Sequence, residues 1–130
     1  LIVTDREQVA ITVETAAGHL RANRDAELMA MIAPDADELR GLANAYLPRV
    51  DVAEVVLSDM KVEISEATAA PMATVQVLGR ITLEAPATGD FPYQTFGPLP
   101  FVIRLQKRGD QWLLTGFRWE RGPIPNSPGL

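Results

Sequence analysis

The chain has 130 residues, 47% of them hydrophobic and 22% charged, which is enough for one domain with its own core. Its net charge of −5 and its scattered basic residues argue against binding to nucleic acid or to an anionic membrane surface. The absence of cysteine excludes disulfides, thiolate nucleophiles and zinc–thiolate sites, and with a single histidine, His19, we expect neither a metal site nor a cofactor.

No apolar run approaches the roughly 18–20 residues that a membrane span needs, so no span is predicted in this chain. The chain begins with Leu1-Ile2-Val3 and not with methionine. This start has two interpretations: a remainder after a removed signal peptide or anchor, or an arbitrary starting point. The first predicts an extracytoplasmic domain tethered by an N-terminal segment that this chain lacks.

The first part of the chain is expected to be helical. The spacing from Thr4 to Glu7 is that of a capping box, and it predicts a helix over Asp5–Asn23 with one apolar stripe. A short helix is predicted over Asp25–Ile32, and a third over Asp37–Tyr46, closed by Pro48.

From Val52 onward the apolar period changes to two, which predicts four main antiparallel strands. The core face of the first strand is expected to carry Val56, Met60, Val62 and Ile64, and Gly79 in the second suggests a bulge. Prolines and glycines predict a long loop over Glu84–Pro100, and Arg108-Gly109-Asp110 predicts a hairpin turn into the last strand. The tail, residues 122–130, is expected to be extended or disordered.

Three helices followed by a curved antiparallel sheet is the element order of the NTF2-like, cone-shaped α+β superfamily. The segments Asn23–Leu28 and Leu28–Pro34 resemble the turn into the short second helix of that family and the helix itself. The ending Arg108–Phe117, in which Trp112 opens the final strand, is similar to its last hairpin. The resemblance covers about residues 4–121, as one domain, and extends to bacterial members that follow a membrane anchor. A cystatin-like fold is the alternative.

The resemblance implies a helix-covered concave sheet face that can hold an apolar pocket. Its expected lining is apolar or aromatic and comes from helices and strands alike: Val13, Ala17, Leu20, Met29, Tyr46, Met60, Phe101, Phe117 and Trp119. The alternative is that these side chains fill a core, in which Phe117 and Trp119 are buried.

Catalysis of the ketosteroid-isomerase or cyclase kind needs an ionisable base inside such a pocket. Alternation places Asp59 and Glu63 on the outward face and leaves Ser58 and Thr115 as inward polar groups, while His19 is expected at a solvated helix border. We therefore favour a non-catalytic domain that binds a protein partner or a small apolar ligand. A small-molecule isomerase, dehydratase or cyclase is the alternative.

The outward sheet face is expected to mix charged and apolar residues, which is typical of a protein interface. A homodimer through this outer face is therefore predicted. Its apolar members are expected to be Val55, Leu57, Leu78, Val102 and Trp112.

Overall fold

A computed structural model describes residues 4–66, 70–84 and 93–119 of the chain. The described elements are α1 (Asp5–Arg21), α2 (Asp25–Ala30), α3 (Asp37–Tyr46), the 3-10 helix η1 (Leu47–Arg49), β1 (Asp51–Ser65), β2 (Met72–Glu84), β3 (Tyr93–Arg108) and β4 (Gln111–Trp119). The strands form one antiparallel sheet in the order β1-β2-β3-β4. The predicted α+β fold, with helices first and the sheet after, is confirmed, whereas the predicted tail lies outside the described residues.

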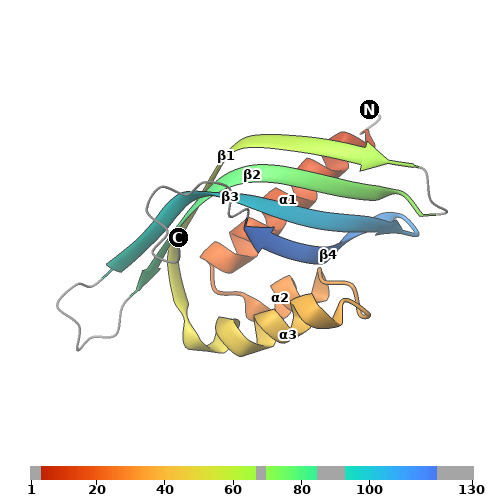
Figure 1. Ribbon diagram of the computed structural model, residues 1–130. Coiled ribbons are helices and arrows are strands. Elements are labelled where there is room, and N and C mark those ends of the chain that lie inside the picture. The colour runs from red at the N-terminus through yellow and green to blue at the C-terminus, as the bar shows by residue number, and fades with distance from the viewer. Residues whose placement is uncertain (1–3, 67–69, 85–92, 120–130) are drawn as a thin grey trace, which may run out of the picture.

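The core lies between α1 and the sheet face that α1 crosses. The other two helices, α2 and α3, lie below β4 in the view of Figure 1. Val9, Val13 and Ala17 lie about one turn apart on α1 and are buried against the sheet. Leu105 and Val75 on the central strands are completely buried beneath them. None of the helices in the described residues is long and apolar enough to span a membrane.

The helix boundaries follow from local hydrogen bonds. Thr4 caps α1 as predicted: its Oγ1 accepts from the Glu7 amide at 3.2 Å and donates to the Glu7 carboxylate at 3.1 Å. The prediction that α1 reaches Asn23 is wrong, because Asn23 has the left-handed φ of 57°. The prediction that α2 reaches Ile32 is also wrong. The backbone of the segment after it turns to β4, where the Leu114 amide donates to the Met31 carbonyl at 2.9 Å.

The third helix has its predicted bounds, but the chain stays helical into η1. Leu47 has φ −56° and ψ −42°, although it precedes Pro48. The proline falls in the first turn of the 3-10 helix, where its missing amide hydrogen costs no hydrogen bond.

Irregularities in β1 change which side chains face the core. Register shifts between Val52 and Glu54 and between Ser58 and Lys61 each insert an extra residue, and each insertion reverses the alternation. The prediction that Val56 faces the core is therefore wrong: Val56 is 38% exposed, whereas Val55 is buried. Beyond the second shift Val62 and Ile64 pack against the core as predicted.

The last strand contains a further shift, opposite Arg104 and Leu105. Before this shift Trp112 and Leu114 are buried in the core, so the predicted outward position of Trp112 is wrong. The predicted outward positions of Val55 and Leu57 on β1 are wrong for the same reason, because both pack into the core clusters. After it, Phe117 is back on the inner sheet face, where its ring stacks on Phe101 with 5.2 Å between centroids.

The third strand begins earlier than predicted. Tyr93 to Pro100 pairs with β2 instead of forming a loop, while residues 85–92 of the predicted loop lie outside the described residues. Among the described residues, β4 pairs with β3 only from Phe101 onward, so the prolines before Phe101 interrupt no described ladder on that side of β3. The predicted irregularity at Gly79 is confirmed as a register shift between Gly79 and Ile81.

Candidate functional site

The residues predicted to line a pocket divide into a buried set and an exposed set. Val13, Ala17 and Phe101 are buried in the core clusters. Leu20, Met29 and Met60 are partly buried against those clusters. The interior beneath α1 is thus occupied by packed side chains.

Two of the predicted residues are exposed instead. Tyr46 at the end of α3 is 60% exposed, and Phe117 on β4 is 41% exposed. The expectation that Phe117 is buried is therefore wrong, and the Trp119 side chain lies outside what the structure describes.

Two further large apolar side chains are exposed, one on α3 and one on the inner face of the sheet. Leu42 is 41% exposed on α3, on the helix face that carries Leu39 and Ala43 against the core. Phe96 is 48% exposed and lies opposite Ile81 across β2 and β3, so it shares the inner face of Ile81. We call Leu42, Tyr46, Phe96 and Phe117 the apolar mouth.

The elements that carry the apolar mouth are held together by specific contacts. Arg40 on α3 donates from one nitrogen to the carbonyls of Met29, at 3.3 Å, and Ile32, at 3.2 Å, which attaches α3 to the end of α2. Arg108 at the end of β3 contacts the Asp35 carboxylate at 2.7 Å, just before α3. This guanidinium holds the pKa of the Asp35 carboxyl below its usual value.

The described part of the inner face offers no group for acid–base chemistry. Every described residue that is fully buried is apolar. Asp59 and Glu63 are exposed on β1, and Ser58, expected inside, is exposed because of the neighbouring bulge. His19 lies at the end of α1, where its Nδ1 accepts from the Arg24 side chain at 3.1 Å.

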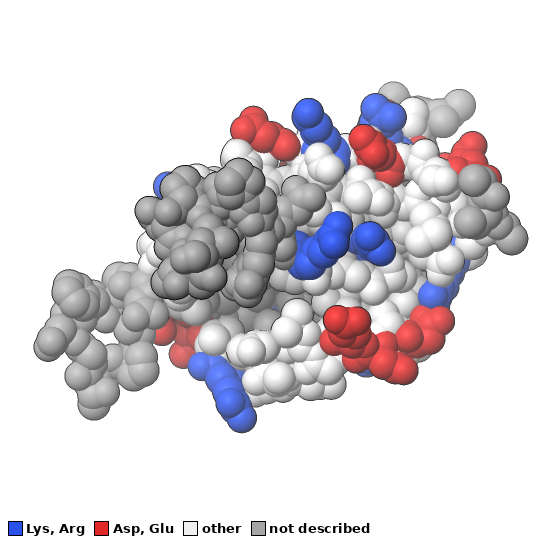
Figure 2. Space-filling view, in the orientation of Figure 1, with Lys and Arg blue, Asp and Glu red and all other residues white. Residues whose placement is uncertain are grey.

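Charged side chains lie instead around the outer surface, where lysines, arginines and acids are scattered among uncharged residues (Figure 2). The described residues contain no group of three histidines or acids that could hold a metal ion.

Two hollows lie outside the inner face. One, of about 280 Å³, is on the outer sheet face beside Glu63, Thr74 and Arg104. The other, of about 440 Å³, lies between α1 and the start of β4 and is lined by Ile11 and Trp112 among others. The Trp112 Nε1 is buried and has no hydrogen-bond partner among the described residues. This atom is inaccessible to solvent, so it does not open into the hollow.

The sequence contained signals for the missed members of the apolar mouth. Leu42 lies four residues before Tyr46 in the predicted third helix, so helical spacing places it on the same face as that predicted pocket residue. Phe96 lies among the prolines and glycines that predict a loop, although Thr95 and Phe96 could also continue the alternation of the strand.

No protein-family model and no curated protein matches this chain. Solved structures do. A candidate dehydratase of the NTF2-like family from Streptomyces avermitilis is 14% identical, with a TM-score of 0.67 over 88% of this chain and 94% of that one. An NTF2-like protein from Cytophaga hutchinsonii is 12% identical, with a TM-score of 0.59 over 90% and 98%.

A candidate scytalone dehydratase from Novosphingobium aromaticivorans is also similar, at 14% identity and a TM-score of 0.58 over 87% of this chain and 82% of that one. At these identities the likeness concerns the backbone, and it agrees with the three helices and the four-stranded antiparallel sheet described above. The chain therefore has the fold of the NTF2-like superfamily.

Proposed function

We propose that this domain binds an uncharged, apolar ligand at the apolar mouth and does not catalyse a reaction on it. The observation that carries the proposal is the exposure of four large apolar side chains, Leu42 and Tyr46 on α3 and Phe96 and Phe117 on the inner sheet face. Exposed apolar patches of this kind mark binding sites in soluble proteins. Phe117 presents an aromatic ring whose position is fixed by the stack on Phe101.

The non-catalytic half of the proposal has a separate support. General acid–base catalysis requires an ionisable side chain close to the reacting atoms, with a pKa moved toward the working pH. Among the described residues, the exposed Asp35 lies beside Arg108, which lowers the pKa of its carboxyl and makes it a weaker base. An enzyme of the dehydratase kind is the alternative, and the structural neighbours with that designation favour it.

The binding half is tested with Nile red, a neutral dye whose fluorescence rises in apolar surroundings. We expect saturable binding to the wild type, and about 10–100-fold weaker binding to Phe117→Ser, because an apolar side chain contributes roughly 1.5–3 kcal/mol when it is buried against a ligand. Val56→Ser is the matched control, since Val56 is also exposed but lies on the outer face. Equal weakening by both variants would contradict a site at the apolar mouth.

The enzymatic alternative is tested with a β,γ-unsaturated ketone, whose isomerisation to the conjugated ketone needs a base and is visible by absorbance. We expect no turnover above the buffer rate. Turnover that disappears in His19→Gln or in a variant of a described carboxylate would overturn the non-catalytic half, and would leave the dye result unaffected.

A further inference from the structure

The edge of β4 that faces away from β3 is closed at Leu114 but open two residues earlier. The Leu114 amide donates to the Met31 carbonyl at 2.9 Å, and the Leu114 carbonyl accepts from the Ala33 amide at 2.8 Å. Residues 31–33 thus form a short parallel bridge on this edge. Residues two apart in an antiparallel strand turn their backbone groups to the same side, so the amide and the carbonyl of Trp112 also point away from β3.

These two backbone groups of Trp112 have no hydrogen-bond partner among the described residues, and a hollow lies beside them. This is the hollow of about 440 Å³, and its lining comes from α1, from the end of α2 and from the start of β4. Its apolar lining includes Ile11 of α1, which is 55% exposed. Free backbone groups on a strand, next to an exposed apolar side chain, are what an added strand requires.

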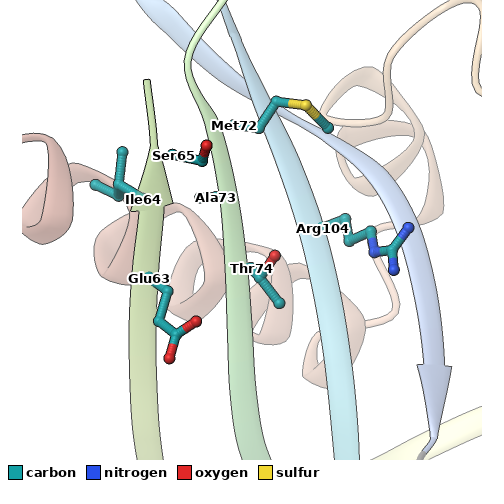
Figure 3. A pocket seen from close by; sticks show the side chains of 7 residues that line it. All are labelled: Glu63, Ile64, Ser65, Met72, Ala73, Thr74 and Arg104. Carbon is teal, nitrogen blue, oxygen red and sulfur yellow. The ribbon is translucent and has the colours of Figure 1, made fainter. Parts of the chain in front are cut away.

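The other hollow, on the outer sheet face, offers no position of this kind. Figure 3 shows Thr74 of β2 there, between Glu63 and Arg104. Thr74 pairs with Glu63 on one side and with Arg104 on the other, so the backbone of β2 is already used within the sheet. Strand addition is therefore expected at the hollow beside β4 and not at this one.

The charges around the open edge of β4 are negative. Asp110 lines the hollow, and its lining contains no lysine or arginine among the described residues. Glu7 and Glu14 lie within about 60° of Ile11 around α1, since each residue of a helix advances by about 100°. None of these three carboxylates forms an ion pair with a residue that the structure describes.

The cations next to this edge on β3 do not offset its charge. Lys107, which is in register with Trp112, is held by the Asp5 carboxylate at 3.1 Å. Arg108 is held by the Asp35 carboxylate at 2.7 Å. Because both cations are already paired, the three carboxylates are left to attract a positively charged partner.

We propose that the open edge of β4 at Trp112 binds an extended peptide of a partner protein, in which lysine or arginine flanks an apolar residue. The peptide continues the edge that residues 31–33 begin: one of its carbonyls accepts from the Trp112 amide, and one of its amides donates to the Trp112 carbonyl. Its apolar side chain packs on Ile11, and its basic side chains face the three carboxylates. This site shares no residue with the apolar mouth, so it does not depend on the proposed function.

The test is an NMR titration of the ¹⁵N-labelled chain with the peptide acetyl-Lys-Thr-Ile-Thr-Lys-amide, whose lysines and isoleucine share one face when it is extended. We expect saturable shifts of the Trp112 and Leu113 amide signals, with a dissociation constant of about 0.1–1 mM, because ordering a short peptide offsets most of its contacts. Methylation of the three central amide nitrogens of the peptide should weaken binding about tenfold or more, because it removes the donors to the strand.

Variants of the chain test the apolar and the charged contacts separately. Ile11→Ser should weaken binding about tenfold, and Asp110→Lys about three- to tenfold. The matched controls are Val56→Ser on β1 and Glu38→Lys on α3, which change exposed residues away from the hollow and should stay within about twofold of the wild type. All four positions are exposed, so the fold should tolerate these changes.

Three outcomes would overturn the proposal. The absence of saturable shifts up to about 5 mM peptide would exclude the site. Equal binding of the methylated peptide would show that the backbone of β4 is not paired. Shifts centred on Leu42 and Phe117 would place the peptide at the apolar mouth and not at the edge of β4.

Discussion

At the scale of single residues, the exposed edge of β1 is closed by side chains from the end of α1. Asn23 receives a hydrogen bond from the Val52 amide at 2.9 Å and donates one to the Val52 carbonyl at 3.0 Å, as a neighbouring strand would. Arg21 donates to the Val55 carbonyl at 2.8 Å. Edge strands with free backbone groups promote aggregation, so these contacts and the two bulges protect the edge.

Asn23 therefore has two roles, a left-handed backbone conformation after α1 and two hydrogen bonds to Val52, and substitutions can separate them. Asn23→Gly keeps the positive φ and loses two hydrogen bonds, which should lower the free energy of unfolding by about 1–2 kcal/mol. Asn23→Ala loses the bonds and also places a Cβ in a left-handed conformation, for a total of about 2–4 kcal/mol. Urea denaturation measures both. Equal values for the two variants would show that the conformation of Asn23 contributes nothing.

No sequence pattern predicted the Asn23 contact, because the partner is 29 residues away in the chain and the hydrogen bonds go to backbone atoms. Thr4 was predictable because its partner, Glu7, is three residues away. Local contacts can be inferred from spacing, whereas contacts across the fold depend on how the elements are placed.

At the scale of elements, the sheet bends where β2 and β3 approach each other closely. Gly97 has φ 99°, and a Cβ at this position would overlap with the Gly79 carbonyl oxygen. A Cβ on Gly79 would lie 2.5 Å from the Phe101 ring. Both positions require glycine because backbone or ring atoms occupy the space of a side chain.

Gly97→Ala should therefore destabilise the domain by about 3 kcal/mol or more, since it combines strain at positive φ with overlap. Gly109→Ala shares the positive φ, at 63°, but has open space around it, and should cost only about 1–2 kcal/mol. Gly41→Ala on α3 also has open space and should stabilise by roughly 0.5–1 kcal/mol. Denaturant midpoints measure this order of stability. If Gly97→Ala is as stable as Gly109→Ala, the close approach of Gly97 to the Gly79 carbonyl is disproved.

The bulges also explain which predictions about faces failed. The period of two predicted that antiparallel strands follow the helices, and it predicted Val62 and Ile64 against the core. It could not predict where an extra residue reverses the alternation, so Val56 was assigned to the core and Trp112 to the outer face. The candidate site was affected in the same way, because Phe117 returns to the inner face only through the shift in β4.

At the scale of the whole molecule, the homodimer predicted through the outer sheet face stays a prediction, and most of the apolar residues that suggested it do not lie exposed on that face. Of the five apolar residues expected on the outer face, Val55, Leu57 and Trp112 pack into the core clusters. Val102 is buried as well, at 3% exposure, which leaves Leu78 as the one partly exposed member of this set that lies outside the clusters.

The helical layer and the sheet are joined by an ion pair whose contribution should depend on pH. Arg108 holds Asp35 at 2.7 Å and lowers the pKa of that carboxyl from its ordinary 3.8. A carboxyl with a lower pKa in the folded state binds its proton less readily than in the unfolded chain, so the pair stabilises the fold above pH 3.8 and loses this effect as the pH falls through the lowered value.

Asp35→Asn should therefore lower Tm slightly at pH 6, where the wild type keeps the pair. At a pH below the lowered value, the two proteins should melt together, because Asp35 is then neutral in both states. Thermal scans of both proteins between these limits measure the difference, and Glu38→Gln, a change of the same charge on the exposed side of α3, controls for the loss of one negative charge. A Tm difference that persists unchanged at the acidic limit would show that Asp35 acts through packing and not through its charge.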